Sequence, residues 1–282
     1  MVVNDKFEIE KDLSGDFLYG EDFNDAQTEQ WFREEINAYA SIGRENHGGY
    51  QYSYHGVNIY HGFKHLPKNK EKIRVLSIGG YYGDELLPII EKISEIFILE
   101  PSNSFINKTL NNVKITYLMA DPSGKIPIET NSIDLITCFG ALHHMPKIMP
   151  ILGEINRTLK PNALAMIREP IVSMGDWSKK RIGLTKNERG IPLNIFRQSI
   201  LNNNFNIIHE RLCFFLLSSY LVRLFSHLKI SLYNFVFFAF WDDLVCNQIP
   251  WNIRYHPQTL IKKIQPSCVF FVIQKGKSEN SP

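Results

Sequence analysis

The chain has few cysteines and little net charge for its 282 residues. Its four cysteines, Cys138, Cys213, Cys246 and Cys268, lie far apart and form no C-x-x-C pair, which argues against a redox motif and a disulfide framework. The formal net charge is only +2 at pH 7, so no strong field would attract a nucleic-acid backbone, and no nucleic-acid partner is expected. The first residues, M-V-V-N-D-K-F-E, are too polar for a signal peptide. A reducing, cytoplasmic location is therefore the default expectation.

A long uninterrupted apolar run is also missing. The most apolar region, residues 218–265, contains L-Y-N-F-V-F-F-A-F-W, but Arg223, His227 and Lys229 break its longest apolar portion. A membrane-spanning helix needs about 20 apolar residues, so no integral membrane segment is expected. We interpret the region as an added pair of helices that packs on a sheet, covers a substrate site or forms the face of a homodimer. Contact with a membrane or a lipid-linked substrate is the alternative.

The dinucleotide-binding fingerprint G-x-G-x-x-G is absent as well, although its surroundings are present. Residues 73–85 read I-R-V-L-S-I-G-G-Y-Y-G-D-E, an apolar run typical of a buried parallel strand followed at once by glycines. Tyr81 and Asp84 stand where the fingerprint needs glycine. Residues 84–92 then predict a helix, and a second apolar run over residues 96–99 ends in Glu100. A carboxylate at the end of the second strand of such a unit can accept hydrogen bonds from a ribose, so we expect a nucleoside-binding crevice.

Here the sequence resembles the class I S-adenosylmethionine-dependent methyltransferases, in particular the type 11/12-like ones. Their first loop reads (D/E)-x-G-x-G-x-G, where this chain has Ser77 for the acid and Tyr81 for the middle glycine. Their later motifs follow in order: Asp121 in L-M-A-D-P-S, paired histidines after the fourth strand in residues 132–145, and a Leu-Lys-Pro turn before a fifth strand in residues 154–170. The resemblance covers roughly residues 73–170, and the order of the motifs is more specific than any single one.

The resemblance implies S-adenosylmethionine as cofactor and methyl transfer as the reaction. It places the glycine loop by the methionine portion, Glu100 on the ribose hydroxyls and Asp121 by the adenine amine. His143 and His144 are the best candidates for a general base near neutral pH, since histidine titrates there, although such a pair can simply shape the cleft. The expected cofactor-binding residues are Ser77, Gly79, Gly80, Tyr81, Gly83, Glu100, Pro101, Asp121, Pro122, Phe139 and Gly140.

Two segments outside these motifs are candidates for substrate contacts. Residues 47–65 interleave histidine, tyrosine and glycine, which suits a sugar ring, although packing of a cap on the sheet explains them equally well. We select Tyr52, Tyr54, His55 and Tyr60 from this segment. The polar loop 171–192 follows the fifth strand and adds Asp176, Trp177, Arg181, Glu188 and Arg189, unless it is only a solvated connection. Its arginines, Arg181 and Arg189, would suit a phosphate or carboxylate on the substrate.

No metal site is predicted. His47, His55, His61 and His65 could together face one ion, but no carboxylate or cysteine falls at ligand spacing among them.

Together these features predict an α/β fold, the Rossmann-like seven-stranded sheet of class I methyltransferases. We divide the chain into an N-terminal cap (1–71, with a helix over 22–42), a cofactor-binding core (72–217), an aromatic helical insertion (218–265), and a last strand with its tail (266–282). The predicted function is methyl transfer to a small molecule, such as a sugar or nucleotide-sugar hydroxyl. A catalytically inactive binding or scaffold protein is the first alternative, because Ser77 and Tyr81 depart from the loop pattern. An NAD(P)-dependent oxidoreductase is the second.

Overall fold

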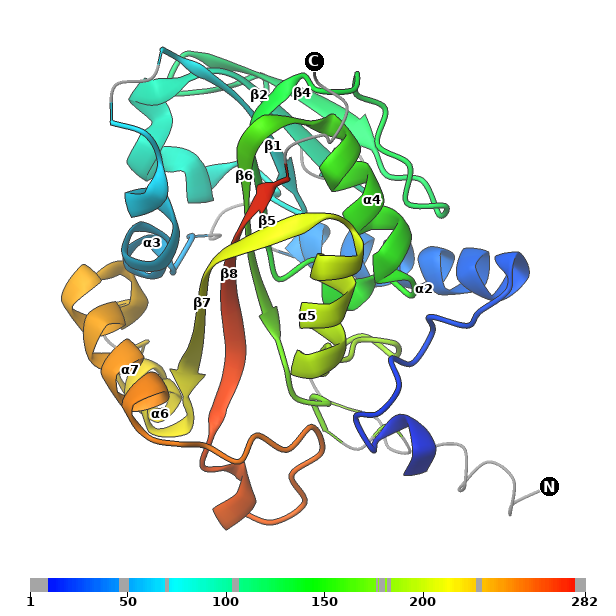
Figure 1. The fold of residues 1–282 in the computed structure, drawn as a ribbon, viewed down its shortest axis with the longest axis vertical. Coiled ribbons are helices and arrows are strands. Elements are labelled where there is room, and N and C mark those ends of the chain that lie inside the picture. Colours follow the sequence, from blue (N-terminus) through cyan, green and yellow to red (C-terminus); the bar gives the residue numbers. More distant parts are fainter. Residues whose placement is uncertain are drawn as a thin grey trace.

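The architecture is a central mixed sheet with helices on both faces (Figure 1). The computed structural model describes residues 10–45, 51–68, 71–102, 107–175, 177, 181, 184–226 and 230–276, without the side chains of 39–45. Eight strands are hydrogen-bonded in the order β3-β4-β2-β1-β5-β6-β8-β7. They are β1 (Ile73–Ile78), β2 (Ile93–Glu100), β3 (Thr109–Leu110), β4 (Val113–Met119), β5 (Ile133–Phe139), β6 (Leu159–Pro170), β7 (Phe205–Phe215) and β8 (Pro266–Lys275).

The predicted α/β class is confirmed, with one strand more than the seven expected. The additional strand is β3, a two-residue piece antiparallel to β4 at the edge of the sheet. Strands β4, β2, β1, β5 and β6 run parallel to one another, whereas β8 lies antiparallel between β6 and β7. The carboxyl ends of the five parallel strands therefore meet at one edge, where open α/β sheets hold their ligands.

Each face of the sheet is buried in its own hydrophobic cluster. Helices α4 (Ile148–Thr158) and α5 (Leu193–Asn202) cover one face, with Ile151, Ile155 and Phe196 packed inward. The other face is covered by the helical turns Asp84–Lys92, by residues 55–65 and by α7 (Val236–Gln248). Covering both faces explains why the strands read as continuous apolar runs, such as Val75, Leu76 and Ile78, rather than as alternating ones.

Local sequence determines where and how several helices form. Helix α2 (Asp25–Glu45) begins after Asn24. The Asn24 side chain accepts a hydrogen bond from the Gln27 main-chain N–H at 3.0 Å, and the Gln27 side chain accepts one from the Asn24 main-chain N–H at 3.0 Å. This reciprocal pair is a capping box. The segment 84–92 was predicted as a helix and forms 3-10 turns, because Pro88 cannot donate the hydrogen bond that an α-helix needs. Short helical pieces complete the chain: α3 (His55–Val57), Asn58–Gly62, Phe63–His65, Leu142–His144, Leu232–Asn234 and Ile261–Lys263.

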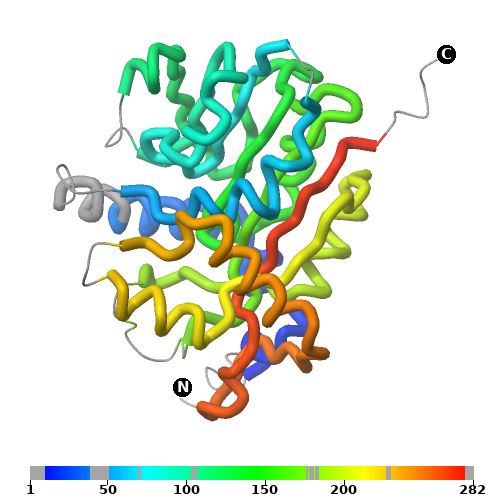
Figure 2. Tube along the Cα trace, turned by 90° about the vertical axis from the view of Figure 1, so that its left-hand side faces the viewer, coloured from blue at the N-terminus to red at the C-terminus, as the bar shows by residue number. Residues whose placement is uncertain are grey.

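Two helices, α6 (Leu216–Ser226) and α7, lie between β7 and β8, where the sequence indicated an added helical pair. Asp242 of α7 accepts main-chain hydrogen bonds from β7, at 2.8 Å from Phe214 and 3.0 Å from Phe215. Figure 2 shows α7 beside the segment that follows residue 51, and the His55 N–H donates to Asn234 at 3.0 Å. Apolar side chains remain exposed on this pair, among them Leu217, Tyr220, Leu224 and Phe237. The homodimer through this region stays a prediction.

Among the described residues, the helices are all too short or too polar to cross a bilayer.

Candidate functional site

The glycine loop after β1 makes a sharp left-handed turn. Gly79 and Gly83 have φ angles of 70° and 81°, and Tyr81, which stands where the family has glycine, also has a positive φ of 51°. A residue with a side chain adopts this conformation at some cost, whereas glycine does so freely. At Gly80 space is the constraint, since a Cβ atom there would lie 2.0 Å from the Ser77 hydroxyl oxygen. The loop therefore makes a left-handed turn of the kind that glycine favours, with Tyr81 included in it.

The carboxylate of Glu100 fixes this loop from the end of β2. The Tyr81 main-chain N–H donates to Glu100 Oε1 at 2.7 Å, and the Tyr117 hydroxyl donates to the Tyr81 carbonyl at 2.9 Å. Glu100 is buried, and this burial raises its pKa to about 7 despite the hydrogen bond from Tyr81. Tyr81 thus takes part in the site through its main chain.

A second buried carboxylate stands beside Ser77, the residue that replaces the acid of the family loop. The Ser77 hydroxyl donates a hydrogen bond to Glu85, which lies at the start of the turns that follow the loop. Burial raises the pKa of Glu85 to about 7, and the Ser77 hydroxyl opposes that shift. The carboxyl group of Glu85 therefore lies next to Ser77, the position where the family has an acid, although it comes from a residue eight positions later in the sequence.

A cavity of about 240 Å³ lies at the carboxyl edge of the sheet. Four residues of α2, Asp25, Thr28, Phe32 and Glu35, close it from the N-terminal side. Asp121 lines it from an exposed position, where its side chain accepts a hydrogen bond from the Ser123 main chain at 2.8 Å. The structure brings seven of the predicted cofactor residues together in its wall: Gly79, Tyr81, Glu100, Pro101, Asp121, Pro122 and Gly140. Ser77, Gly80, Gly83 and Phe139 lie outside this wall, in or next to the strands that carry it.

The paired histidines have different environments, and only one lines the cavity. His144 lies in the wall, and its Nδ1 is 3.0 Å from Glu35 Oε2. Burial and the neighbouring His143 lower the pKa of His144. His143 is buried, with Nδ1 2.7 Å from Glu169 and Nε2 3.4 Å from Glu188, and these carboxylates raise its pKa to about 9 against the effect of burial. A raised pKa favours the protonated form, which cannot accept a proton, so His144 is the better placed of the two and a general-base role for His143 stays a prediction.

The predicted substrate residues of the N-terminal segment do not line this cavity. The Tyr52 hydroxyl accepts a hydrogen bond from Asn58 at 2.7 Å, and the Tyr60 hydroxyl donates to Asp243 of α7 at 3.1 Å. Tyr54 packs on Phe214 and Tyr233, and His55 packs on Tyr52. These contacts support the packing interpretation, in which the segment attaches the cap to the sheet and to α7. His47 lies outside the described residues, as does Asp176.

The two arginines of the loop after β6 hold main-chain oxygens. Arg189 is fully buried, and its guanidinium donates to the carbonyls of Tyr19, His143, Met145 and Pro146 at 2.7 to 3.1 Å. Arg181 donates to four carbonyls of its own loop, the shortest contact being 2.6 Å to Glu188. Their donors are engaged with the main chain, so the expectation that they bind a substrate anion is not supported.

Three carboxylates around the histidines were not predicted as site residues in these roles. Glu169 accepts hydrogen bonds from the main chain of Ala141 and Leu142 at 2.9 and 2.8 Å, besides its contact with His143. Its position at the end of a parallel strand was the available signal. Glu35 lies on the same face of α2 as Thr28 and Phe32, at helical spacing, which could have indicated a shared wall. Glu188 was foreseen only as a substrate contact.

Comparison with known proteins agrees with this geometry. The model of the methyltransferase domain family matches residues 59–225, more than half of the chain. No curated protein matches significantly.

Solved structures show the same fold at low sequence identity. The complex of the Haloferax volcanii Trm112 methyltransferase activator with a methyltransferase gives a TM-score of 0.56 at 15% identity, covering 86% of this chain and 98% of that chain. The YcgJ protein from Bacillus subtilis gives 0.50 at 16% identity, covering 79% and 99%. Phosphoethanolamine N-methyltransferase 2 of Haemonchus contortus, solved with S-adenosylhomocysteine, gives 0.51 at 14% identity, covering 76% and 51%. The chain therefore belongs to the methyltransferase domain family, and the class I, S-adenosylmethionine-dependent methyltransferase predicted from its motifs is confirmed.

Proposed function

We propose that the chain methylates a hydroxyl group of a small molecule, with sugars and nucleotide sugars as the first class to test. The observation that supports this most is the buried Glu100, which stands in the wall of a cavity between the glycine loop and the start of the 121–125 turn. The same cavity holds His144, a histidine with a lowered pKa, at its wall. An acceptor hydroxyl must lose a proton during methylation, whereas the cofactor needs only to be held and oriented.

The residues of the cavity have features that suit the cofactor. Glu100 would accept hydrogen bonds from the ribose hydroxyls, and the main chain at Gly79, which lines the cavity, would allow the methionine portion to come close. When bound, S-adenosylmethionine supplies a methyl group on a positively charged sulfur, which is strongly electrophilic. The side chains of α2 would exclude water, and His144 would take the proton with Glu35 holding its Nδ1. Alignment supplies up to about 7 to 11 kcal/mol in favourable cases, and a general base about 10²- to 10⁴-fold in rate.

Replacement of Glu100 by alanine is expected to weaken binding of S-adenosylhomocysteine at least about 100-fold. Each hydrogen bond to a charged group contributes about 1.5 to 3 kcal/mol, and the variant removes both ribose contacts. The measurement is titration calorimetry with S-adenosylmethionine, S-adenosylhomocysteine and NADH. Glu95→Ala is the matched control, because Glu95 lies on the same strand but pairs with Arg74 at 3.2 Å, outside the cavity.

The outcomes of this titration separate the candidate functions. Tight binding of the adenosyl ligands by the wild type and by Glu95→Ala, with loss in Glu100→Ala, would support the proposal and lead to an acceptor screen. An absence of adenosyl-ligand binding in the wild type would favour the inactive scaffold. Binding of NADH in its place would favour the oxidoreductase.

Affinity for S-adenosylhomocysteine is expected to rise as the pH increases through about 7 and to level off above it. Burial keeps Glu100 protonated up to that pH, its pKa being raised to about 7, while the ionised form is the better acceptor for two hydroxyls. Binding therefore lowers this pKa and releases a proton. Calorimetry in buffers of different ionisation enthalpy would count the released proton. Glu100→Gln should bind more weakly with little pH dependence, while affinity that fell with rising pH in the wild type would contradict the assignment.

A further inference from the structure

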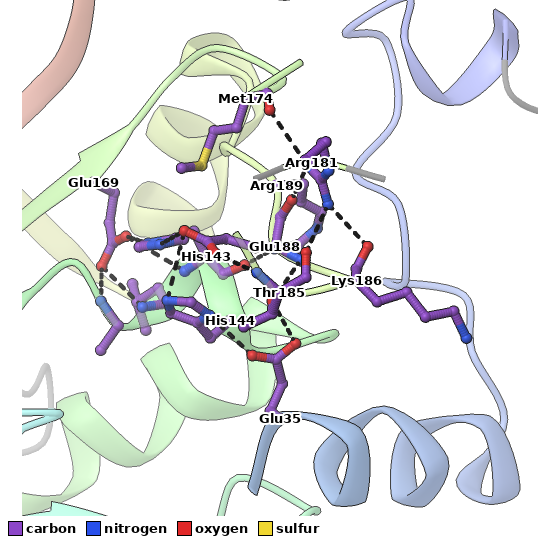
Figure 3. A network of polar contacts seen from close by, with 12 residues as sticks. Glu35, His143, His144, Glu169, Met174, Arg181, Thr185, Lys186, Glu188 and Arg189 are labelled. Atoms are coloured by element: carbon purple, nitrogen blue, oxygen red, sulfur yellow. Dashed lines mark hydrogen bonds and ion pairs between the residues drawn. The ribbon is translucent and has the colours of Figure 1, made fainter. Parts of the chain in front are cut away.

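Two histidines and one carboxylate point at a common position beside the cavity (Figure 3). Glu188 Oε1 lies 3.4 Å from His143 Nε2 and 4.0 Å from His144 Nε2. The ligand atoms of the three residues all lie within 4.8 Å of one another. Zinc binds histidine nitrogen and carboxylate oxygen at about 2.0 to 2.2 Å, so two ligand atoms on one ion are about 3 to 4 Å apart. The two contacts to Glu188 fall within that range.

The other ring nitrogen of each histidine is held by its own carboxylate. His143 Nδ1 contacts Glu169 Oε2 at 2.7 Å, and His144 Nδ1 contacts Glu35 Oε2 at 3.0 Å. A carboxylate only accepts hydrogen bonds, so each Nδ1 carries the hydrogen and each ring presents Nε2 toward Glu188. Histidines that ligate metals are oriented by such an acceptor on the second nitrogen. This arrangement therefore goes beyond a chance cluster of polar groups.

Two of the carboxylates, Glu188 and Glu35, are held in place by Thr185 of the loop after β6. The Thr185 main-chain N–H donates to Glu188 Oε2 at 2.9 Å, which leaves Oε1 as the oxygen nearest the histidines. The Thr185 hydroxyl donates to Glu35 Oε1 at 2.8 Å, which leaves Oε2 for His144. Each side chain of the group thus has its orientation fixed by a second contact.

Charge also favours a cation at this position. Glu35, Glu169 and Glu188 are 4%, 0% and 8% exposed, so three carboxylates are gathered in the protein interior around two histidines. Buried carboxylates are costly unless they are paired with positive charge. The guanidinium groups of the two arginines of the loop donate to main-chain oxygens.

We propose that His143, His144 and Glu188 bind one divalent transition-metal ion, of the Zn²⁺, Co²⁺ or Fe²⁺ type. Two imidazoles and a carboxylate suit such borderline ions rather than Mg²⁺ or Ca²⁺, which prefer oxygen ligands. Three protein ligands leave coordination positions open, as in catalytic sites. His144 and Glu35 line the cofactor cavity, so the ion would lie next to it and could contact the acceptor. While the ion is bound His144 would not act as the general base, and the ion would instead lower the pKa of an acceptor hydroxyl that contacts it. That last role rests on the proposed function, whereas the metal site itself does not.

Cobalt titration of the full chain, first stripped with a chelator, tests the site without any methyl transfer. The wild type should bind one Co²⁺ per chain, with visible absorption bands of low-symmetry nitrogen and oxygen ligation, and Zn²⁺ should displace it. Glu188→Gln and His144→Asn should each weaken binding at least tenfold. His65→Asn is the matched control, because His65 lies in a separate histidine group with His209, at 4.8 Å between ring centroids.

The proposal fails if the wild type binds neither ion, or if binding is unchanged in Glu188→Gln and His144→Asn, or if His65→Asn abolishes it. Circular dichroism of each variant shows whether it is folded. X-ray absorption of the zinc-loaded wild type tests the site without any variant. Two imidazole ligands on the zinc would support the proposed site, whereas one or none would overturn it. Binding of S-adenosylhomocysteine, measured with and without Zn²⁺, is recorded separately, so failure of the metal site and failure of the methyltransferase function are distinguishable.

Discussion

Arg189→Met is expected to reduce the free energy of unfolding by about 4 kcal/mol or more. The Arg189 side chain is fully buried and donates to four carbonyl oxygens, which belong to Tyr19 and to the 143–146 segment. Methionine fills a similar volume but donates nothing, and each buried acceptor that loses its partner costs about 1 to 3 kcal/mol. Urea unfolding followed by tryptophan fluorescence and by circular dichroism measures the loss.

Arg197→Met provides the comparison for this variant. Arg197 forms an ion pair with Glu210 at 2.6 Å on the surface, with its side chain 40% exposed. Exposed pairs contribute about 0 to 1 kcal/mol, so this control should be nearly neutral. A free energy of unfolding of Arg189→Met within about 1 kcal/mol of the wild-type value would contradict this prediction. It would show that water satisfies those carbonyls and that Arg189 does not join the segment around Tyr19 to the histidine loop.

Gly80→Ala is expected to weaken binding of S-adenosylhomocysteine at least about 100-fold while leaving the sheet folded. The new Cβ atom would lie 2.0 Å from the Ser77 hydroxyl oxygen and 2.7 Å from Glu85 Oε1, both buried groups that are hydrogen-bonded to each other. Relief of that overlap must move the loop main chain or break the Ser77 to Glu85 contact. Overpacking of this kind costs about 1 to 3 kcal/mol in stability, and the binding surface moves with the loop. Calorimetry and thermal unfolding give the two readouts.

Gly153→Ala is the matched control for the added methyl group. Gly153 lies within α4, where a Cβ atom would find the Asn203 side chain at an ordinary 3.4 Å. Alanine favours helix more than glycine does, so this variant should be as stable as the wild type or more so. Unchanged ligand affinity in Gly80→Ala would show that the loop can shift without consequence and that it does not contact the cofactor.

The fold was predictable because its strands are continuous apolar runs in the sequence, and glycine and proline separate these runs. The strand around Val75 and Leu76 and the last strand, residues 266–275, were both located from such runs. The helix expected over residues 22–42 forms as α2, which begins after Asn24, a residue type that caps helices well. These signals are local, since burial on both faces and the end of a helix depend on neighbouring residues.

The site was predictable only where it lies at the ends of strands. Glu100 ends the second strand and Asp121 follows the fourth one, and both line the cavity, while their roles toward the cofactor stay predictions. The partners of His143 and His144 could not be foreseen, because Glu35 is 109 residues from His144 and meets it only when α2 docks. The sequence also does not show that Arg189 donates its hydrogen bonds to main-chain oxygens and not to a substrate. Such assignments depend on tertiary contacts that no periodicity encodes.

The docking of α2 has a consequence for how the shape of the cavity can be changed. The helix spans Asp25–Glu45, ahead of residue 59, where the match to the family begins, yet it closes the cavity with Thr28, Phe32 and Glu35. The α2 wall of the cavity thus lies outside the part of the chain that matches the family, whereas the sheet and the glycine loop lie inside it. We therefore expect substitutions on the cavity face of α2 to change the shape of the cavity without disturbing the strands.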